Sequence, residues 1–253
     1  MPTEARDATV APRATPAERV AAWAVHVYTA CGALTALAAL VAAAGGRFAA
    51  AFGWLWLAVA IDATDGTFAR AARVKQVLPH FDGAKLDDIV DYLTFVLVPI
   101  FVMLQAGILE GALGVVAATA ATLASAYRFC HSAAKTADHF FTGFPSYWNI
   151  VALYLYVFEP APAVSAALVL VLAALVLVPL RFIYPSRMPT LRRSSVGLGV
   201  VWAVLVGILV LRLESRPKTL AAVSLYYPLY YTLASFALDW ESRRAARRAR
   251  GVN

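Results

Sequence analysis

Charged side chains are scarce in this sequence. They make up 15% of its 253 residues, whereas hydrophobic residues make up 61%. A soluble domain carries about 25% charged and about 45–50% apolar residues. Because this chain has too few polar residues to cover a water-soluble globule, the composition predicts an integral membrane protein.

Cysteine is nearly absent as well, since the sequence has two, Cys31 and Cys130, which lie far apart in apolar or near-apolar segments. Two isolated cysteines indicate neither a disulfide framework nor a zinc site. The sequence also lacks a Gly-rich phosphate loop that follows a strand. Its first nineteen residues lack the features of a clear signal peptide. Any chemistry must therefore come from other groups.

Long runs without a charged residue are abundant, and they indicate the membrane spans directly. A helix needs about 20 apolar residues to cross roughly 30 Å of hydrocarbon. Eight such runs occur, at 20–46, 48–61, 92–109, 111–127, 140–158, 160–180, 194–211 and 219–238. The second run is too short alone, so we expect its helix to continue through Asp62, Asp65 and Gly66. The sequence predicts an all-α polytopic membrane protein with about eight transmembrane helices.

Basic residues indicate the orientation, because short loops rich in Lys and Arg stay in the cytoplasm. With eight crossings, both termini and the loops after the second, fourth and sixth spans share one side, which holds 18 of the 22 basic residues. We therefore expect both termini in the cytoplasm. The chain divides into a polar segment at 1–19, a single eight-helix membrane domain at 20–240 and a basic tail at 241–253. The net charge of +7 is interpreted as an affinity for anionic lipid and not for nucleic acid.

Acidic residues gather at the junction of the second and third expected helices. Six of the fifteen lie there within thirty positions: Asp62, Asp65, Asp82, Asp87, Asp88 and Asp91. Spacings of three and four put Asp62 with Asp65, and Asp87 with Asp91, on one face of each helix. Carboxylates near a membrane interior need compensating cations, and oxygen ligands select Mg²⁺, Mn²⁺ or Ca²⁺. The pattern predicts a divalent-metal site formed by Asp62, Asp65, Asp87 and Asp91.

Small residues and one arginine flank these acids. Gly66 and Ala69 follow the first pair, Gly83 precedes the second, and such residues let backbones or a flat ligand approach closely. Arg70 can bind a phosphate with its forked donors. Together these groups provide a site for a divalent metal, an arginine for phosphate and room for a planar group, which are the requirements for binding a diphosphate-linked nucleotide. The alternative interpretation is a tightly packed helix pair with an ion-paired cytoplasmic end.

A known signature is similar to this constellation. The positions Asp62, Asp65, Gly66, Ala69, Arg70, Gly83, Asp87 and Asp91 resemble the motif of the CDP-alcohol phosphotransferase family. Twelve residues separate Arg70 from Gly83, more than is usual in that family. This spacer, the stretch 77–92 and the segment 140–149 look like those of the bacterial phosphatidylcholine synthases, a subfamily with eight predicted spans. The resemblance covers most of the chain.

The resemblance implies the fold of that family, an activity and the site residues. The membrane domain would be catalytic and would transfer the phosphatidyl group of CDP-diacylglycerol to choline, releasing CMP. Asp62, Asp65 and Asp87 would hold Mn²⁺ or Mg²⁺, and Asp91 would complete the metal site and act as general base. Gly66, Ala69, Arg70 and Gly83 would bind the donor. The resemblance also implies a bacterial inner membrane, an active site on its cytoplasmic face and a possible homodimer.

Choline recognition is expected to use aromatic faces, because a quaternary ammonium group cannot donate conventional hydrogen bonds. Candidates on the cytoplasmic half are Tyr92, Phe129, Phe140, Phe141, Phe144, Tyr147 and Trp148. From these we select Tyr92, Tyr147 and Trp148 as predicted substrate-binding residues.

Two alternative functions remain open at this point. The acceptor could be serine, inositol phosphate or glycerol phosphate, and Arg128 and Arg181 could supply cations for a phosphorylated acceptor. The chain could also be an ion-coupled transporter, but a transporter would place its acids near the midplane and often in paired halves. Here the acids lie at one interface and within one helix pair, which favours the enzyme.

Overall fold

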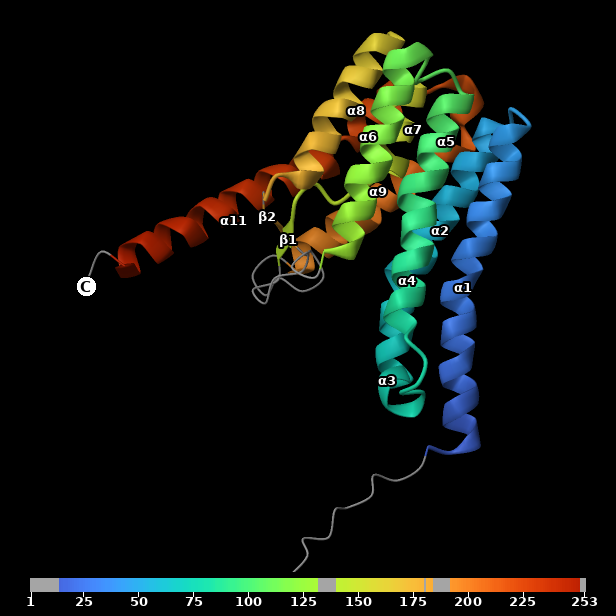
Figure 1. Ribbon diagram of the computed structural model, residues 1–253, viewed down its shortest axis with the longest axis vertical. Coiled ribbons are helices and arrows are strands. Elements are labelled where there is room, and N and C mark those ends of the chain that lie inside the picture. The colour runs from blue at the N-terminus through green and yellow to red at the C-terminus, as the bar shows by residue number, and fades with distance from the viewer. Residues whose placement is uncertain (1–13, 132–139, 180, 184–191, 251–253) are drawn as a thin grey trace, which may run out of the picture.

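The computed structural model describes residues 14–131, 140–179, 181–183 and 192–250, and nearly all of these are helical (Figure 1). The first half comprises α1 (Pro16–Ala44), α2 (Phe48–Ala71), α3 (Val74–Val77), α4 (Gly83–Asp91), the π-helical turn η1 (Tyr92–Leu97), α5 (Val98–Gln105) and α6 (Gly111–Cys130). The second half comprises α7 (Trp148–Phe158), α8 (Pro162–Leu177), α9 (Arg192–Leu211), the 3₁₀ turn η3 (Leu213–Ser215), α10 (Lys218–Ser224) and α11 (Tyr226–Arg250).

Four of the described helices, α1, α2, α6 and α9, are long and apolar enough to cross a membrane, and α7 and α8 are shorter apolar helices. This agrees with a helical membrane protein. As predicted, α2 continues past its uncharged run through Asp62, Asp65 and Gly66. The expected third span is a continuous helical rod in which η1 links α4 to α5.

A short β pair modifies the all-α prediction. Strands β1 (Phe140–Thr142) and β2 (Arg181–Ile183) pair antiparallel, with Phe141 opposite Phe182. The pair ties the segment after α6 to the segment after α8. Three residues are too few to show the alternating pattern by which a strand is recognised in a sequence, so this element was not predicted.

Helices α1 and α2 form a hairpin that packs beside the candidate site. Thr15 and Glu18 form a capping box at the start of α1, in which the Thr15 hydroxyl accepts from the Glu18 backbone N–H at 3.2 Å. Only Gly45, Gly46 and Arg47 connect α1 to α2, and Gly46 has a φ of 71° that favours glycine. The two helices are therefore antiparallel neighbours.

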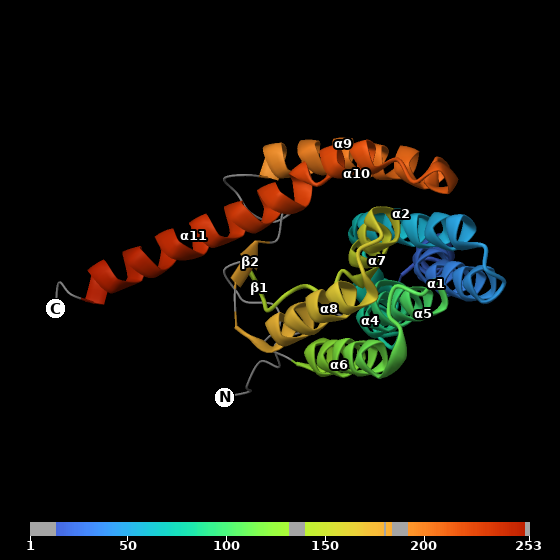
Figure 2. The same ribbon diagram turned by 90° about the horizontal axis from the view of Figure 1, so that it is seen from above.

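The core draws its buried residues from α1, α2 and α5 to α9. Alanines of α1 such as Ala36 and Ala39 pack in one buried cluster with Phe52 of α2 and Met103 of α5. Small side chains on α1 allow its backbone to approach the neighbouring helices closely. Figure 1 shows that α1, α2 and α4 extend beyond the other helices at the end where α3 lies. Figure 2 shows α9 and α10 beside α2 and α7, with α11 projecting away from the bundle.

Candidate active site

Three carboxylates converge between α2 and α4. Asp62, Asp87 and Asp91 each offer an oxygen, these oxygens lie within 4.8 Å of one another, and all three residues are half-buried. Divalent cations bind oxygens at about 2.0–2.6 Å, so oxygens on opposite sides of one ion lie about 4–5 Å apart. The chemistry and spacing of this donor set therefore fit a Mg²⁺-like or Ca²⁺-like cation.

Asp65, the fourth predicted ligand, contacts α1. Its side chain is buried, and its Oδ2 accepts a hydrogen bond of 2.8 Å from the Thr29 hydroxyl of α1. Among the described residues, the carboxylate group within 4.8 Å contains Asp62, Asp87 and Asp91 but not Asp65. Direct ligation by Asp65 thus stays a prediction, and its observed contact is with α1.

Asp91 is the last residue of α4 before the third uncharged run, and its half-buried carboxyl oxygen lies within 4.8 Å of those of Asp62 and Asp87. Burial and like charges both disfavour an ionised carboxyl. The carboxylates are thus close enough for their repulsion to require a proton or a cation.

Gly66, Ala69 and Arg70 lie on the last turns of α2. A Cβ at Gly66 would lie 3.4 Å from Arg70 Nη1, so the guanidinium folds back over this glycine. Arg70 is exposed, and its Nη2 donates to the Thr67 hydroxyl at 3.0 Å. Ala69 packs beside the cluster of Ala22, Val74 and Val77. Arg70 is therefore accessible to a ligand, while Ala69 serves the packing of α1 against α3.

Gly83 is the first residue of α4, and it contacts α1. A Cβ at this position would lie 2.5 Å from Cε1 and 3.0 Å from Nδ1 of the His26 ring. The residue before it, Asp82, caps α4, because its Oδ1 accepts from the Lys85 backbone N–H at 3.1 Å. The structure thus provides a packing reason for Gly83, and a contact with nucleotide stays a prediction.

Two of the three selected aromatic residues keep some accessible surface. Tyr92 follows Asp91 directly, donates to the Thr122 carbonyl at 3.3 Å and meets the Phe129 ring edge-on. Tyr147 packs against Phe95 with a centroid separation of 5.8 Å. Both are half-buried.

Trp148 requires a correction. Its side chain has no exposed surface, and its Nε1 donates to the Ser125 hydroxyl at 2.8 Å. Phe144 meets the Trp148 ring edge-on. Trp148 is therefore a core residue of this fold and does not present a face to a ligand. The side chains of Phe140 and Phe141 lie outside the described part of the structure.

His26 and Thr29 of α1 contact the site and were missed from the sequence. A signal was present: two polar residues three positions apart within an apolar span lie on one helix face and require partners there. Their partners could not be deduced from the sequence, because both lie on other helices.

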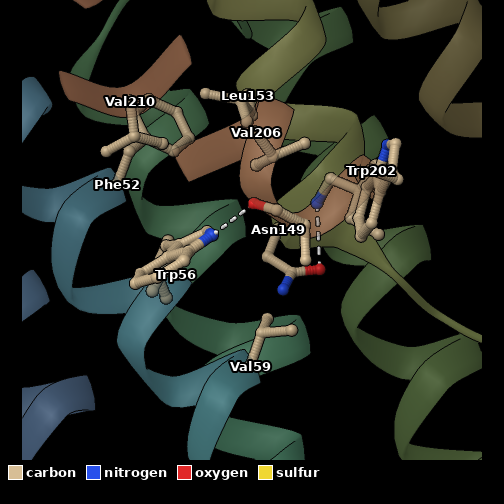
Figure 3. Close-up of a pocket in the computed structure, with 11 residues that line it drawn as sticks. Phe52, Trp56, Val59, Asn149, Leu153, Trp202, Val206 and Val210 are labelled. Atoms are coloured by element: carbon tan, nitrogen blue, oxygen red, sulfur yellow. Dashed lines mark hydrogen bonds between the residues drawn. The ribbon is translucent and has the colours of Figure 1, made fainter. Parts of the chain in front are cut away.

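An apolar pocket lies between α2, α7 and α9 (Figure 3). It is lined by Phe52, Leu55, Trp56, Val59, Asn149, Ile150, Leu153, Trp202, Ala203, Val206 and Val210. Trp56 Nε1 donates to the Ala203 carbonyl at 3.2 Å, and the Asn149 side-chain oxygen accepts from the Ile150 N–H at 2.9 Å. Val59, which lines this pocket, lies one helical turn before Asp62 on α2.

Comparison with known proteins identifies the class. No protein-family model matches the chain. The phosphatidylcholine synthase of Pseudomonas aeruginosa is 39% identical over 198 residues, which cover 78% of this chain and 83% of that protein. The phosphatidylcholine synthase of Rhizobium meliloti is 37% identical over 212 residues, 83% of this chain and 88% of that protein. That of Legionella pneumophila is 43% identical over 177 residues, 70% and 69% of the two chains.

The chain has apolar helices, and two of its helices bring carboxylates together. With these relatives, the features define a membrane phosphatidyltransferase of the CDP-alcohol phosphotransferase type. More narrowly, the chain belongs to the phosphatidylcholine synthase family.

Proposed function

We propose that this protein transfers the phosphatidyl group of CDP-diacylglycerol to choline, forming phosphatidylcholine and releasing CMP. The observation that carries the proposal is the convergence of Asp62, Asp87 and Asp91 oxygens within 4.8 Å in a chain 36–46% identical to proteins named phosphatidylcholine synthase. A diphosphate needs compensating positive charge before an oxygen nucleophile can approach its phosphorus.

The carboxylate group is proposed to bind Mn²⁺ or Mg²⁺ through Asp62, Asp87 and Asp91, with Asp65 close by. When bound, such a cation neutralises diphosphate charge and stabilises the departing CMP. Arg70, which is exposed beside Gly66, is proposed to bind a phosphate oxygen. Gly66 is proposed to leave room for the cytidine.

Asp91 is proposed to accept the proton of the choline hydroxyl. The choline oxygen then bonds to the phosphorus next to the lipid, and the bond from that phosphorus to CMP breaks. Asp91 suits this role because it lies at the membrane end of α4, directly before Tyr92. Tyr92 and Tyr147 are proposed to face the quaternary ammonium group, since both retain accessible surface near the rod of α4, η1 and α5.

The lipid chains are proposed to extend along α2. The pocket between α2, α7 and α9 is apolar and begins one turn before Asp62 at Val59, which suits an acyl chain whose phosphate lies at the carboxylates. The water-soluble acceptor would reach the same carboxylates from the cytosol.

The proposed topology has eight spans. The rod of α4, η1 and α5 would be the third, α7 and α8 the fifth and sixth, and α10 with α11 the eighth. The basic residues on the side of the termini support a cytoplasmic location for the site and for both ends of the chain. A bacterial inner membrane and a homodimer are proposed from the resemblance alone.

The acceptor decides the function, and one assay tests it. Purified protein would receive CDP-diacylglycerol with labelled choline, serine, inositol phosphate or glycerol phosphate in turn. We expect labelled lipid from choline. Product from a different acceptor alone would reject phosphatidylcholine synthesis but retain the enzyme class, and no product from any acceptor would reject phosphatidyl transfer.

A further inference from the structure

Helix α1 contributes none of the converging carboxylates, yet it contacts both helices that do. Three buried residues of α1, spaced by three, make these contacts: His26, Thr29 and Gly32. Residues three apart lie on one helix face. We call these three residues the α1 seam.

The first contact of the seam holds the start of α4. His26 is 5% exposed, and its ring lies over Gly83 and 4.4 Å from the Phe81 ring centroid. Its Nε2 is buried and has no hydrogen-bond partner among the described residues. A buried nitrogen without a partner costs stability, so the observed contribution of this ring is its packing against Gly83 and Phe81.

The second contact holds α2. The Thr29 hydroxyl donates to Asp65 Oδ2 at 2.8 Å, and both groups are buried. A hydrogen bond to a carboxylate is among the stronger hydrogen bonds in proteins. Because Asp65 lies one turn from Asp62, this bond fixes the position of α2 along the axis of α1 near the carboxylates.

The third contact returns to α4. A Cβ at Gly32 would collide with Cγ1 of Val90, the residue before Asp91. His26 with Gly83 and Gly32 with Val90 therefore bracket Asp87 on its own helix. Two steric contacts on α4, with a hydrogen bond to α2 between them, leave little freedom for either helix to slide.

We infer that α1 is a positioning helix, whose seam sets the height of Asp87 and Asp91 relative to Asp62. The inference rests on the proposed metal-dependent function, and it assigns a role to His26, Thr29 and Gly32 that does not involve contact with substrate. It also assigns Gly83 to helix packing. A misplacement of about 1 Å at a catalytic site can cost on the order of 10²-fold in rate, so close steric contacts are suited to this task.

Compensating pairs test the inference. Gly83→Ala adds a methyl group that the His26 ring does not accommodate, and His26→Ala removes that ring. We expect Gly83→Ala to weaken Mn²⁺ binding and kcat by about tenfold or more, and the double variant to recover most of both. Mn²⁺ binding would be measured directly by electron paramagnetic resonance of free Mn²⁺ in detergent. The pair Gly32→Ala and Val90→Ala tests the third contact in the same way.

Thr29 provides a test without steric change at the helix interface. Thr29→Val removes the donor to Asp65 and should weaken Mn²⁺ binding, whereas Thr29→Ser keeps the hydroxyl and should restore it. Val27→Ala and Leu34→Ala, at positions 60% and 65% exposed on α1, are matched controls that should bind Mn²⁺ as the wild type does.

The outcomes separate the inference from the proposed function. If the Gly83→Ala, His26→Ala double variant is as impaired as Gly83→Ala, Gly83 serves a ligand and the packing role is rejected. If Gly83→Ala does not fold, the Thr29 series decides, and equal Mn²⁺ affinity of Thr29→Val and wild type rejects the positioning role. If wild-type protein binds Mn²⁺ but transfers nothing to choline, the proposed acceptor fails while the positioning role stands.

Discussion

Asp62 and Asp65 lie one turn apart on α2, but their side chains have different surroundings. Asp62 offers an oxygen to the group with Asp87 and Asp91, whereas Asp65 accepts a hydrogen bond from Thr29. Asp65 is therefore held by α1, one turn away from the carboxylate that joins Asp87 and Asp91.

The role of Asp91 as base leads to a prediction. Asp91→Asn should lower kcat by about 10²–10⁴-fold, because an amide cannot accept the choline proton. CDP-diacylglycerol should still bind, since Asp62, Asp87 and Arg70 remain. The measurements are kcat and equilibrium binding of the lipid. Asp88→Asn, at an exposed neighbouring position, is the control and should stay close to wild type; a fully active Asp91→Asn variant would exclude Asp91 as the base.

Helical spacing puts Asp87 and Asp91 on one face, and in the structure Asp62 joins them. The same reasoning placed Asp65 in the group, but its observed contact is with Thr29. The sequence was insufficient for Trp148, since an aromatic residue near a membrane interface has the same local pattern whether it faces a ligand or the core. It was also insufficient for the partners of His26 and Thr29. These depend on which helices pack together, and a single sequence does not encode that in local periodicity.

At the scale of elements, the rod of α4, η1 and α5 shows how a catalytic helix is joined to a packed one. In η1 the Val98 N–H bonds to the Leu93 carbonyl, five residues back. Pro99 follows and has no N–H to continue the α-helical ladder. One extra residue in a helix turns the following part by about 100°. Asp91 can therefore face α2 while Val98 and Val102 lie in the core. A proline such as Pro99 favours a helix kink or end, but the π form depends on packing.

The pocket between α2, α7 and α9 allows a prediction at the same scale. Val59→Trp should fill it and raise the KM for CDP-diacylglycerol by about tenfold, which corresponds to roughly 1.4 kcal/mol, while the KM for choline stays unchanged. The matched control is Val201→Trp, on a 54% exposed position of α9 outside the pocket. Steady-state kinetics in mixed micelles would measure both constants. An unchanged KM for the lipid would show that the acyl chain lies elsewhere.

At the scale of the whole molecule, the carboxylates lie on the helices that extend beyond the rest of the bundle (Figure 1). The predicted cytoplasmic side also carries most of the basic residues. At the opposite end of the bundle, Glu159 after α7 forms an ion pair with Arg216 before α10. Its Oε2 also lies 3.3 Å from Lys218 Nζ. These contacts place charged side chains at the end of the bundle away from the carboxylates.

Metal removal tests the molecule as a whole. EDTA should abolish transfer, and Mn²⁺ or Mg²⁺ should restore it, because close carboxylates need a cation to accept a diphosphate beside them. The measurement is turnover before chelation, after chelation and after metal is returned. A thermal melting curve of the chelated protein provides the control for unfolding. Full activity in rigorously metal-free protein would contradict the proposed mechanism.

The three-residue connection between α1 and α2 matters during biosynthesis. Because the chain emerges from the ribosome in order, we expect α1 and α2 to pair before Asp87 and Asp91 have emerged. Asp65 then has the Thr29 hydroxyl already beside it, and this contact requires no metal ion. We therefore expect this hairpin to insert into the membrane without a bound metal ion.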